Sequence, residues 1–158
     1  MVDPKLKISC TINALYGADT SQFMPKDITF QYSKTGRIRG VYDNDTLLCT
    51  LRVDGGLALS IPLAQMLLRS KQFAESCVEV SADAAPFVEE GRSVFAKHVM
   101  RCGKNVHVGS DTPVIHQGRV IAVGRARLDA NMMTGFKRGV AVKVRKGLKR
   151  RKIVSVTC

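Results

Sequence analysis

Residues 136–145 read Phe-Lys-Arg-Gly-Val-Ala-Val-Lys-Val-Arg, and this stretch decides the fold of the second half of the chain. The lysine, arginine and glycine near its start are typical of a turn. After the turn, valines at 140, 142 and 144 alternate with Ala141, Lys143 and Arg145. Successive side chains of a β-strand point to opposite faces. The stretch therefore predicts a strand with valines on one face and cations on the other.

Outward from this strand, the second half of the chain alternates short strands with turns. We expect strands over 78–80, 93–102, 119–128 and 153–156, with helices over 84–90 and around 130–133. Asp83 is expected to cap the first helix, Gly91 to end it, and Asp129 to cap the second. Turns are expected at Asp111 and Pro113. Short strands separated by turns, with two brief helices, predict a small β-barrel.

Two of these strands carry cations along one face. In the strand over 93–102 that face holds Phe95, Lys97, Val99 and Arg101, opposite Val94, Ala96, His98 and Met100. In the strand over 119–128 it holds Arg119, Ile121, Val123, Arg125 and Arg127. Like charges on neighbouring strands repel unless something anionic compensates them, which favours a bound polyanion. An ordinary solvated strand face is the alternative interpretation.

The first half of the chain predicts a different, smaller module. A helix is expected over 4–16, with Leu6, Cys10 and Ala14 on one stripe and Gly17 at its end. Strands follow over 28–32, 37–42, 46–52 and 57–61, with Leu47, Cys49 and Leu51 facing the same way in the third. Pro62 is expected to start a helix that continues to about Gln72. The prediction is an α+β protein: a small antiparallel α/β sandwich at 1–74, then the barrel at 75–158.

The charge of the chain is concentrated in the second module. The 158 residues contain 25 Lys and Arg against 13 Asp and Glu, a formal net charge of +12. Residues 1–75 carry 9 basic and 7 acidic side chains, whereas residues 76–158 carry 16 basic and 6 acidic ones. A strongly basic half joined to a nearly neutral half is expected of a module that binds a polyanion.

Other functional classes find no support in the sequence. The five cysteines are scattered and form no C-x-x-C pair, and His107 and His116 lack partners at ligand spacing, so no metal site is expected. His98 is expected to be a core histidine, since it faces the same way as Val94, Ala96 and Met100. No phosphate-binding loop, dinucleotide fingerprint, zinc-protease or serine-hydrolase motif is present, so we expect no cofactor and no enzymatic activity. No apolar run could span a bilayer and no signal peptide is evident, so a cytoplasmic protein is expected.

Three stretches in the second half resemble the PUA domain, namely residues 91–97, 123–126 and 136–145. They are most similar to the version at the C-terminal end of archaeosine tRNA-guanine transglycosylase. Residues 23–25, 28–32, 35–39 and 51–57 resemble the small domain that precedes PUA in those enzymes. The catalytic (β/α)₈ barrel of such an enzyme needs roughly 200 residues or more, for which this chain has no room. It looks like the RNA-docking part of such an enzyme, standing alone.

The resemblance implies a pseudobarrel that binds structured RNA at a helical stem and its adjoining single-stranded end. It places the interface at the glycine-led turn after the first barrel helix and at the strand that follows. Carried over, these positions are Gly91, Arg92, Ser93, Phe95 and Lys97. The charge pattern adds Arg101, Arg125, Arg127, Lys137, Arg138, Lys143, Arg145, Lys149, Arg150, Arg151 and Lys152. The last four are expected to form a phosphate-contacting strand or arm, with a solvated extension as the alternative.

Three functional hypotheses follow from the sequence. The first is a non-catalytic protein that docks tRNA or a tRNA-like stem for RNA modification. The second is an assembly subunit of a split tRNA-guanine transglycosylase, whose catalytic half would be a separate protein. The third is a stand-alone PUA translation factor that associates with a ribosomal subunit.

Overall fold

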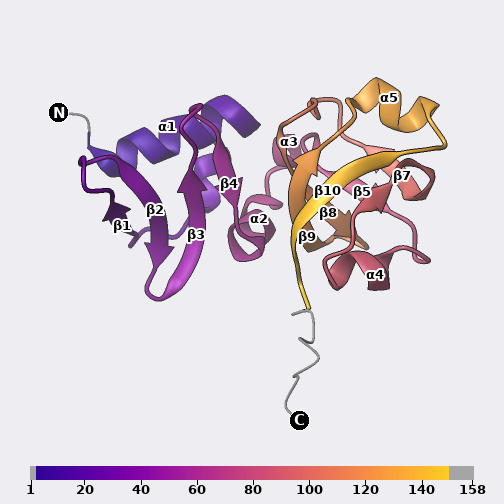
Figure 1. The fold of residues 1–158 in the computed structure, drawn as a ribbon. Helices are drawn as coiled ribbons and strands as arrows, with labels where there is room; N and C mark the ends of the chain where they lie inside the picture. Colours follow the sequence, from indigo (N-terminus) through magenta and orange to yellow (C-terminus); the bar gives the residue numbers. More distant parts are fainter. Residues whose placement is uncertain (1–2, 150–158) are drawn as a thin grey trace, which may run out of the picture.

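The computed structural model describes residues 3–149. The expected strand over 153–156 and the predicted RNA contacts Arg150, Arg151 and Lys152 lie outside the described residues. Figure 1 shows two modules side by side, joined by the segment that contains α2 and α3. None of the helices in residues 3–149 is both long and apolar enough to cross a membrane.

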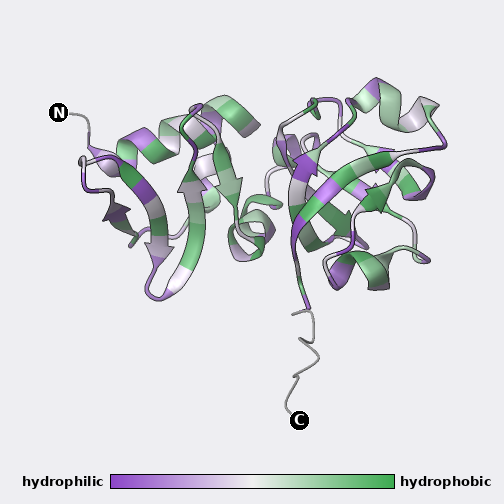
Figure 2. Ribbon diagram, viewed as in Figure 1, coloured by the Kyte–Doolittle hydropathy of each residue, from purple (hydrophilic) through white to green (hydrophobic). Residues whose placement is uncertain are grey.

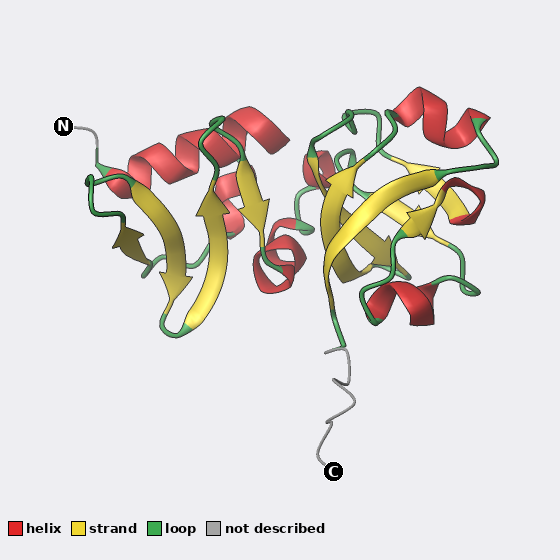
Figure 3. Cartoon of the chain, in the orientation of Figure 1, coloured by secondary structure: helices red, strands yellow, loops and turns green. Residues whose placement is uncertain are grey.

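The first module is a four-stranded antiparallel sheet with helices, as predicted (Figure 3). Its sheet has the order β1-β2-β3-β4, in which every strand pairs with its neighbour in sequence. The strands are β1 (Thr29–Tyr32), β2 (Ile38–Asp43), β3 (Thr46–Leu51) and β4 (Leu57–Leu59). The helices are α1 (Pro4–Tyr16), a 3₁₀ turn η1 (Thr20–Phe23), α2 (Ile61–Leu67) and α3 (Lys71–Ala74).

Helix α1 begins and ends at the predicted residues but buries a different face. Asp3 caps its start by accepting a hydrogen bond from Lys5 N at 3.1 Å, and Gly17 ends it with φ +119°. The predicted stripe of Leu6, Cys10 and Ala14 is exposed. The buried face carries Ile8, Ile12 and Tyr16 instead, because these three side chains remove more apolar area from water than the predicted stripe would.

A β-bulge in β3 corrects the predicted alternation over 46–52. Val41 pairs with Cys49 and Tyr42 pairs with Leu47, so Leu48 has no partner of its own on β2. A bulge of this kind inserts one residue and shifts the side chains that follow it. Leu48 is consequently buried and Leu47 exposed, the reverse of the expectation for Leu47. The predicted helix over 62–72 is likewise two helices, since Ser70 caps α3 by accepting from Phe73 N.

The second module is a nearly closed barrel of six strands with the order β6-β10-β9-β8-β5-β7, which confirms the predicted fold class. All its strand pairs are antiparallel except β5 with β8. The strands are β5 (Val78–Val80), β6 (Val94–Phe95), β7 (Val99–Cys102), β8 (Asp111–His116), β9 (Arg119–Ala126) and β10 (Val140–Gly147). Two short helices complete it, α4 (Ala85–Glu89) and α5 (Ala130–Gly135), together with the 3₁₀ turn η2 (Ala96–His98).

The predicted continuous strand over 93–102 is wrong. Strand β6 pairs with β10, whereas β7 pairs with β5 on the opposite edge of the sheet, so the chain must change neighbours between them. Turn η2 makes this change and ends the alternation, which leaves Met100 exposed and His98 half-buried. Lys97 and Arg101 therefore do not share one continuous strand face.

Two smaller expectations about the barrel are also corrected. Asp83 does not cap α4: the cap position is Ala84, which makes no side-chain cap bond, and Ser81 O accepts hydrogen bonds from Ala84 N and Ala85 N. Asp111 and Pro113 lie within β8 rather than in turns. The predicted Asp129 cap is confirmed, since its Oδ1 accepts from Met132 N at 2.8 Å.

The two modules share a hydrophobic core. One buried cluster contains the residues of the first module and, with them, Ile115, Val120 and Val123 of the barrel. A second cluster fills the barrel interior around Val78, Val114 and other small residues. Figure 2 shows hydrophobic residues on α2 and on the barrel strands beside it. The predicted boundary between residues 74 and 75 stays a prediction.

Gly124 of β9 is expected to tolerate no side chain, because the Cβ of an alanine there would meet the backbone of Lys143 and Val144 on β10. Gly124→Ala should lower the free energy of unfolding by about 1–3 kcal/mol, the usual cost of overpacking. Urea denaturation measures this change in the free energy of unfolding. Gly135→Ala is the control, since nothing lies within 4 Å of its added Cβ. Equal midpoints for wild type and Gly124→Ala would contradict the close approach.

Candidate nucleic-acid interface

Cations and an aromatic ring gather on the outer face of β6, β10 and β9. Val94 and Val142 pair with each other and point into the barrel core, so the adjacent Phe95 and Lys143 point outward. Lys143 lies directly opposite Arg125 on β9. Like charges at opposed positions destabilise a sheet. Within residues 3–149 neither cation forms a salt bridge, so this pair is available to an external anion.

Strands β9 and β10 contribute to one wall of a groove between the modules. The other wall comes from Thr50, Arg52 and Ala58 of the first module. This inter-module groove has a volume of about 630 Å³. Five cations line it: Arg52, Arg125, Arg127, Lys143 and Arg145. The structure thus brings together four predicted site residues and adds Arg52, which the sequence analysis missed.

A buried carboxylate holds two of these arginines and links the modules. The side chain of Asp111 is only 2% exposed. Its Oδ1 accepts from Arg145 Nη1 at 2.7 Å and from Arg52 Nη2 at 3.1 Å, and its Oδ2 accepts from Leu59 N at 2.8 Å. Arg145 Nη2 also donates to Leu59 O at 2.6 Å. Arg145, predicted as an RNA contact, therefore also joins β10 to β4. Because two arginines share one carboxylate, the cluster of Arg52, Arg145 and Asp111 keeps a net positive charge.

The glycine-led turn after α4 forms a second part of the surface. Gly91 has φ +99°, a conformation that favours glycine, and an added Cβ there would meet nothing within 4 Å. The Arg92 guanidinium lies 5.4 Å from the centroid of the exposed Phe87 ring. Ser93 is half-buried, and Lys97 is exposed. Phe95 is 49% exposed, which leaves much of an aromatic ring open to solvent on β6, where it pairs with Val140 of β10.

The remaining predicted contacts fall into two groups. Lys137 and Arg138 are exposed in the loop between α5 and β10. Arg101 and Lys149 are engaged by acidic residues: Arg101 Nη2 lies 3.0 Å from Glu75 Oε1, and Lys149 Nζ lies 3.2 Å from Glu89 Oε2. Arg101 also lies opposite Glu79 across the strand pair. The structure therefore separates Arg101 from the cationic groove.

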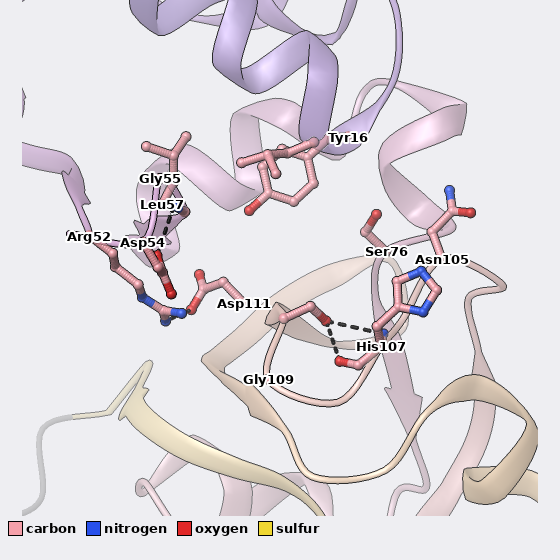
Figure 4. Close-up of a pocket in the computed structure, with 13 residues that line it drawn as sticks. Tyr16, Arg52, Asp54, Gly55, Leu57, Ser76, Asn105, His107, Gly109 and Asp111 are labelled. Carbon is pink, nitrogen blue, oxygen red and sulfur yellow. Dashed lines mark hydrogen bonds and ion pairs between the residues drawn. The ribbon is translucent and has the colours of Figure 1, made fainter.

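A smaller cavity, the inter-module pocket, opens beside the groove (Figure 4). It measures about 380 Å³ and shares Arg52 and Gly109 with the groove. Its walls come from the end of α1, from the β3–β4 turn and from the loop that precedes β8. The sequence analysis missed it, because its lining residues are brought together only by packing of the two modules.

Three cysteines within residues 3–149, Cys49, Cys77 and Cys102, are not activated nucleophiles. Burial raises the pKa of the Cys49 thiol to about 12 and that of Cys102 to about 11, and it also raises the pKa of Cys77. These thiols therefore stay protonated at neutral pH. Residues 3–149 contain no group of three or more His, Cys, Asp or Glu side chains placed to hold a metal ion.

Comparison with known sequences matches both modules to described domain families. Residues 16–73 match the patch-forming domain C2 of tRNA-guanine transglycosylase, and residues 77–148 match the PUA domain. The tRNA-guanine(15) transglycosylase of Methanobrevibacter smithii is 37% identical over 74% of this chain, and that of Methanocaldococcus jannaschii is 32% identical over 91%. The chain spans only 18% and 23% of these two relatives.

Solved structures share the fold. A hypothetical protein from Pyrococcus horikoshii superposes with a TM-score of 0.73 at 20% identity, covering 98% of this chain and 95% of its own. A conserved PUA domain protein from Thermoplasma acidophilum has a TM-score of 0.56 at 24% identity, covering 68% of each chain. The chain thus joins a region that matches the patch-forming domain C2 of tRNA-guanine transglycosylase to a PUA domain.

Proposed function

We propose that this protein is a non-catalytic RNA-binding protein that docks tRNA or a tRNA-like stem. The inter-module groove carries the proposal, because it gathers five cations with one buried carboxylate between two of them. A protein tolerates such a concentration of charge most readily where a polyanion neutralises it. The PUA domain and the likeness to tRNA-guanine(15) transglycosylases support tRNA as the class of RNA.

In this proposal the groove and the exposed ring have different roles. Arg125, Arg127 and Lys143 contact phosphates of a helical stem, which positions the RNA without reading its sequence. An A-form helix hides its major-groove edges, so the groove recognises shape and charge. Phe95, exposed on β6 outside the groove, offers a surface on which an unpaired base at the end of the stem stacks.

The first experiment is binding of the purified protein to total tRNA, and to a hairpin with and without a 3′ CCA end, across a series of salt concentrations. We expect log K to fall linearly with log salt, with preference for the RNA that keeps its single-stranded end. Equal, salt-sensitive binding to every RNA would reduce the function to a basic surface without selectivity. No binding at moderate salt would refute the proposal.

Phe95→Ala is expected to weaken binding to the hairpin that carries a single-stranded end by at least about fivefold, since one lost base stack costs roughly 1 kcal/mol or more. The free energy of unfolding should change little, because the ring is half-exposed. Filter binding at fixed salt measures the effect. Tyr32→Ala, a 50% exposed aromatic on β1 of the other module, is the control. Equal losses for the two variants would argue against stacking at Phe95.

A second candidate function is that of a docking subunit for a separate catalytic protein of the (β/α)₈ type. It is favoured by the small share, about a fifth, of the matching transglycosylases that this chain spans. Size-exclusion chromatography of affinity-captured complexes tests it, with co-elution of a large partner as the expected result. Cosedimentation with ribosomal subunits would instead favour a translation factor.

A further inference from the structure

One wall of the inter-module pocket is a tyrosine whose hydroxyl is open to the cavity. Tyr16, at the end of α1, is 5% exposed and packs edge-on against Phe73 at 5.1 Å between ring centroids. Its hydroxyl makes no hydrogen bond to any group within residues 3–149. Figure 4 shows the ring reaching into the pocket toward Asp111. The ring is held by packing while its hydroxyl faces the cavity, so it can donate to an acceptor on a ligand there.

The phenol of Tyr16 remains a hydrogen-bond donor at all physiological pH values. Burial, and secondarily the negative charge of Asp111, raise its pKa well above the ordinary tyrosine value. The group therefore stays protonated, and its O–H is directed into the cavity.

The charges around the pocket disfavour a phosphate and favour a neutral ligand. Asp54 lines the cavity with no salt-bridge partner among residues 3–149, and its Oδ1 accepts from Gly56 N at 2.9 Å. Arg52 and Asp111 line it as well, and they pair with each other, so Asp54 is the unpaired charge of this lining. Leu15 and Leu57 add apolar walls, while Ser76 and Asn105 add polar groups. A flat, neutral molecule with donors and acceptors on its edges fits this lining, and a volume of about 380 Å³ suffices for a nucleoside.

The neighbouring groove has the opposite character, and the two cavities meet at Arg52 and Gly109. The groove is lined by five cations, whereas the pocket is lined by the unpaired Asp54, the ion pair of Arg52 with Asp111, and the phenol of Tyr16. A single nucleotide combines both chemistries, with an anionic phosphate attached to a neutral base. We propose that, given the RNA binding proposed above, the inter-module pocket accepts one unpaired base of the RNA whose phosphates lie in the inter-module groove.

The test compares two hairpins, one blunt and one with a short 3′ single-stranded extension, against two tyrosine variants. Tyr16→Phe removes only the pocket hydroxyl and keeps the ring that packs on Phe73. It should weaken binding to the extended hairpin about threefold to tenfold, as for the loss of one hydrogen bond, and leave the blunt hairpin unaffected. Tyr42→Phe is the matched control, because the Tyr42 hydroxyl donates to Gln31 on the exposed sheet of the first module.

An abasic site placed at each position of the extension identifies the inserted base. At one position the abasic RNA should bind wild type at least as weakly as the intact RNA binds Tyr16→Phe, and Tyr16→Phe should cause no further loss with that abasic RNA. The stability of Tyr16→Phe should match wild type, since the lost hydroxyl has no protein partner in residues 3–149. A Tyr16→Phe effect that is equal for both hairpins, or additive with every abasic site, would overturn the inference.

Failure of this inference is distinguishable from failure of the proposed function. Salt-sensitive RNA binding by wild type that is indifferent to Tyr16→Phe would remove the base pocket and leave the RNA-binding function standing. Absence of salt-sensitive RNA binding would overturn both. Titration with free nucleosides tests whether the pocket accepts a base of the bound RNA or a free nucleoside. Nucleoside binding that depends on Tyr16, with RNA affinity unchanged in Tyr16→Phe, would overturn the assignment to an RNA base.

Discussion

Asp111→Asn is expected to lower the free energy of unfolding by about 3 kcal/mol, because it removes the charge that joins the two modules. Asp111 accepts hydrogen bonds from two arginines through Oδ1 and from Leu59 N through Oδ2. An asparagine amide has one accepting oxygen, so whichever way it turns, its NH₂ group faces a donor. The variant therefore keeps the shape of the side chain while it breaks at least one of these bonds.

The size of the effect follows from burial. Removing one partner of a buried ion pair typically costs about 3–5 kcal/mol. Here the side chains of Arg52 and Arg145 are 20% and 38% exposed, so both can regain water when the carboxylate is lost, and the lower end applies. For a chain of this length, a loss of about 3 kcal/mol corresponds to a fall in Tm of roughly 6–12 °C. Urea denaturation and thermal melting measure it.

Asp45→Asn is the matched control, since Asp45 is exposed in the turn between β2 and β3 and forms no salt bridge within residues 3–149. Its stability should lie within about 0.5 kcal/mol of wild type. If Asp111→Asn were as stable as Asp45→Asn, the carboxylate would not hold the modules together. A separate unfolding step for each module in the Asp111→Asn variant would show that the contact couples them.

Local signals in the sequence were sufficient to predict where α1 starts and stops. Helix α1 runs over the predicted residues because Pro4 suits the first helical position and Gly17 accepts a positive φ. The turns at Gly36 and Asn44 likewise have the positive φ values expected of turn residues. These properties depend on a residue and its immediate neighbours, which the sequence displays directly.

Features set by distant neighbours could not be predicted in the same way. The bulge at Leu48 exists because β2 and β3 pair in a shifted register, and alternation within β3 alone gives no sign of it. The break at η2 exists because the chain must pair first with β10 and then with β5. Periodicity describes one strand at a time, so it extended the expected strand over 93–102 too far.

The residues of the candidate site show the same difference between what local patterns predict and what distant contacts determine. Lys143 and Arg125 could be placed outward from alternation, and the structure puts them opposite each other. The pairing of Arg145 with Asp111 joins residues 34 positions apart and brings in Leu59 of the other module, a contact that no local pattern encodes. Tyr16 was counted as the end of a helix, and its position in a cavity depends on the docking of both modules.

The triple variant Arg125→Ala, Arg127→Ala, Lys143→Ala is expected to weaken tRNA binding about 100-fold at physiological salt. Each cation that neutralises a phosphate contributes roughly 0.7–0.9 to the slope of log K against log salt, which corresponds to about fivefold in affinity per cation at this salt. The slope should therefore fall by about 2 to 3. Filter binding across a salt series measures both quantities.

Folding and binding should respond separately in this variant. Removing Arg125 and Lys143 ends a repulsion between directly opposed cations, and this gain offsets the lost bond from Arg125 Nε to Gly109 O. Stability should thus stay within about 0.5 kcal/mol of wild type.

The matched control is Lys34→Ala, Arg37→Ala, Arg39→Ala, which removes the same residue types from exposed positions around the β1–β2 turn, none of them lining the groove. Because both triple variants lose three positive charges, a purely nonspecific attraction of RNA to a basic protein would weaken equally in the two. A loss confined to the groove variant would locate the phosphate path between the modules. Equal losses, or an unchanged salt slope in the groove variant, would place the RNA elsewhere on the protein.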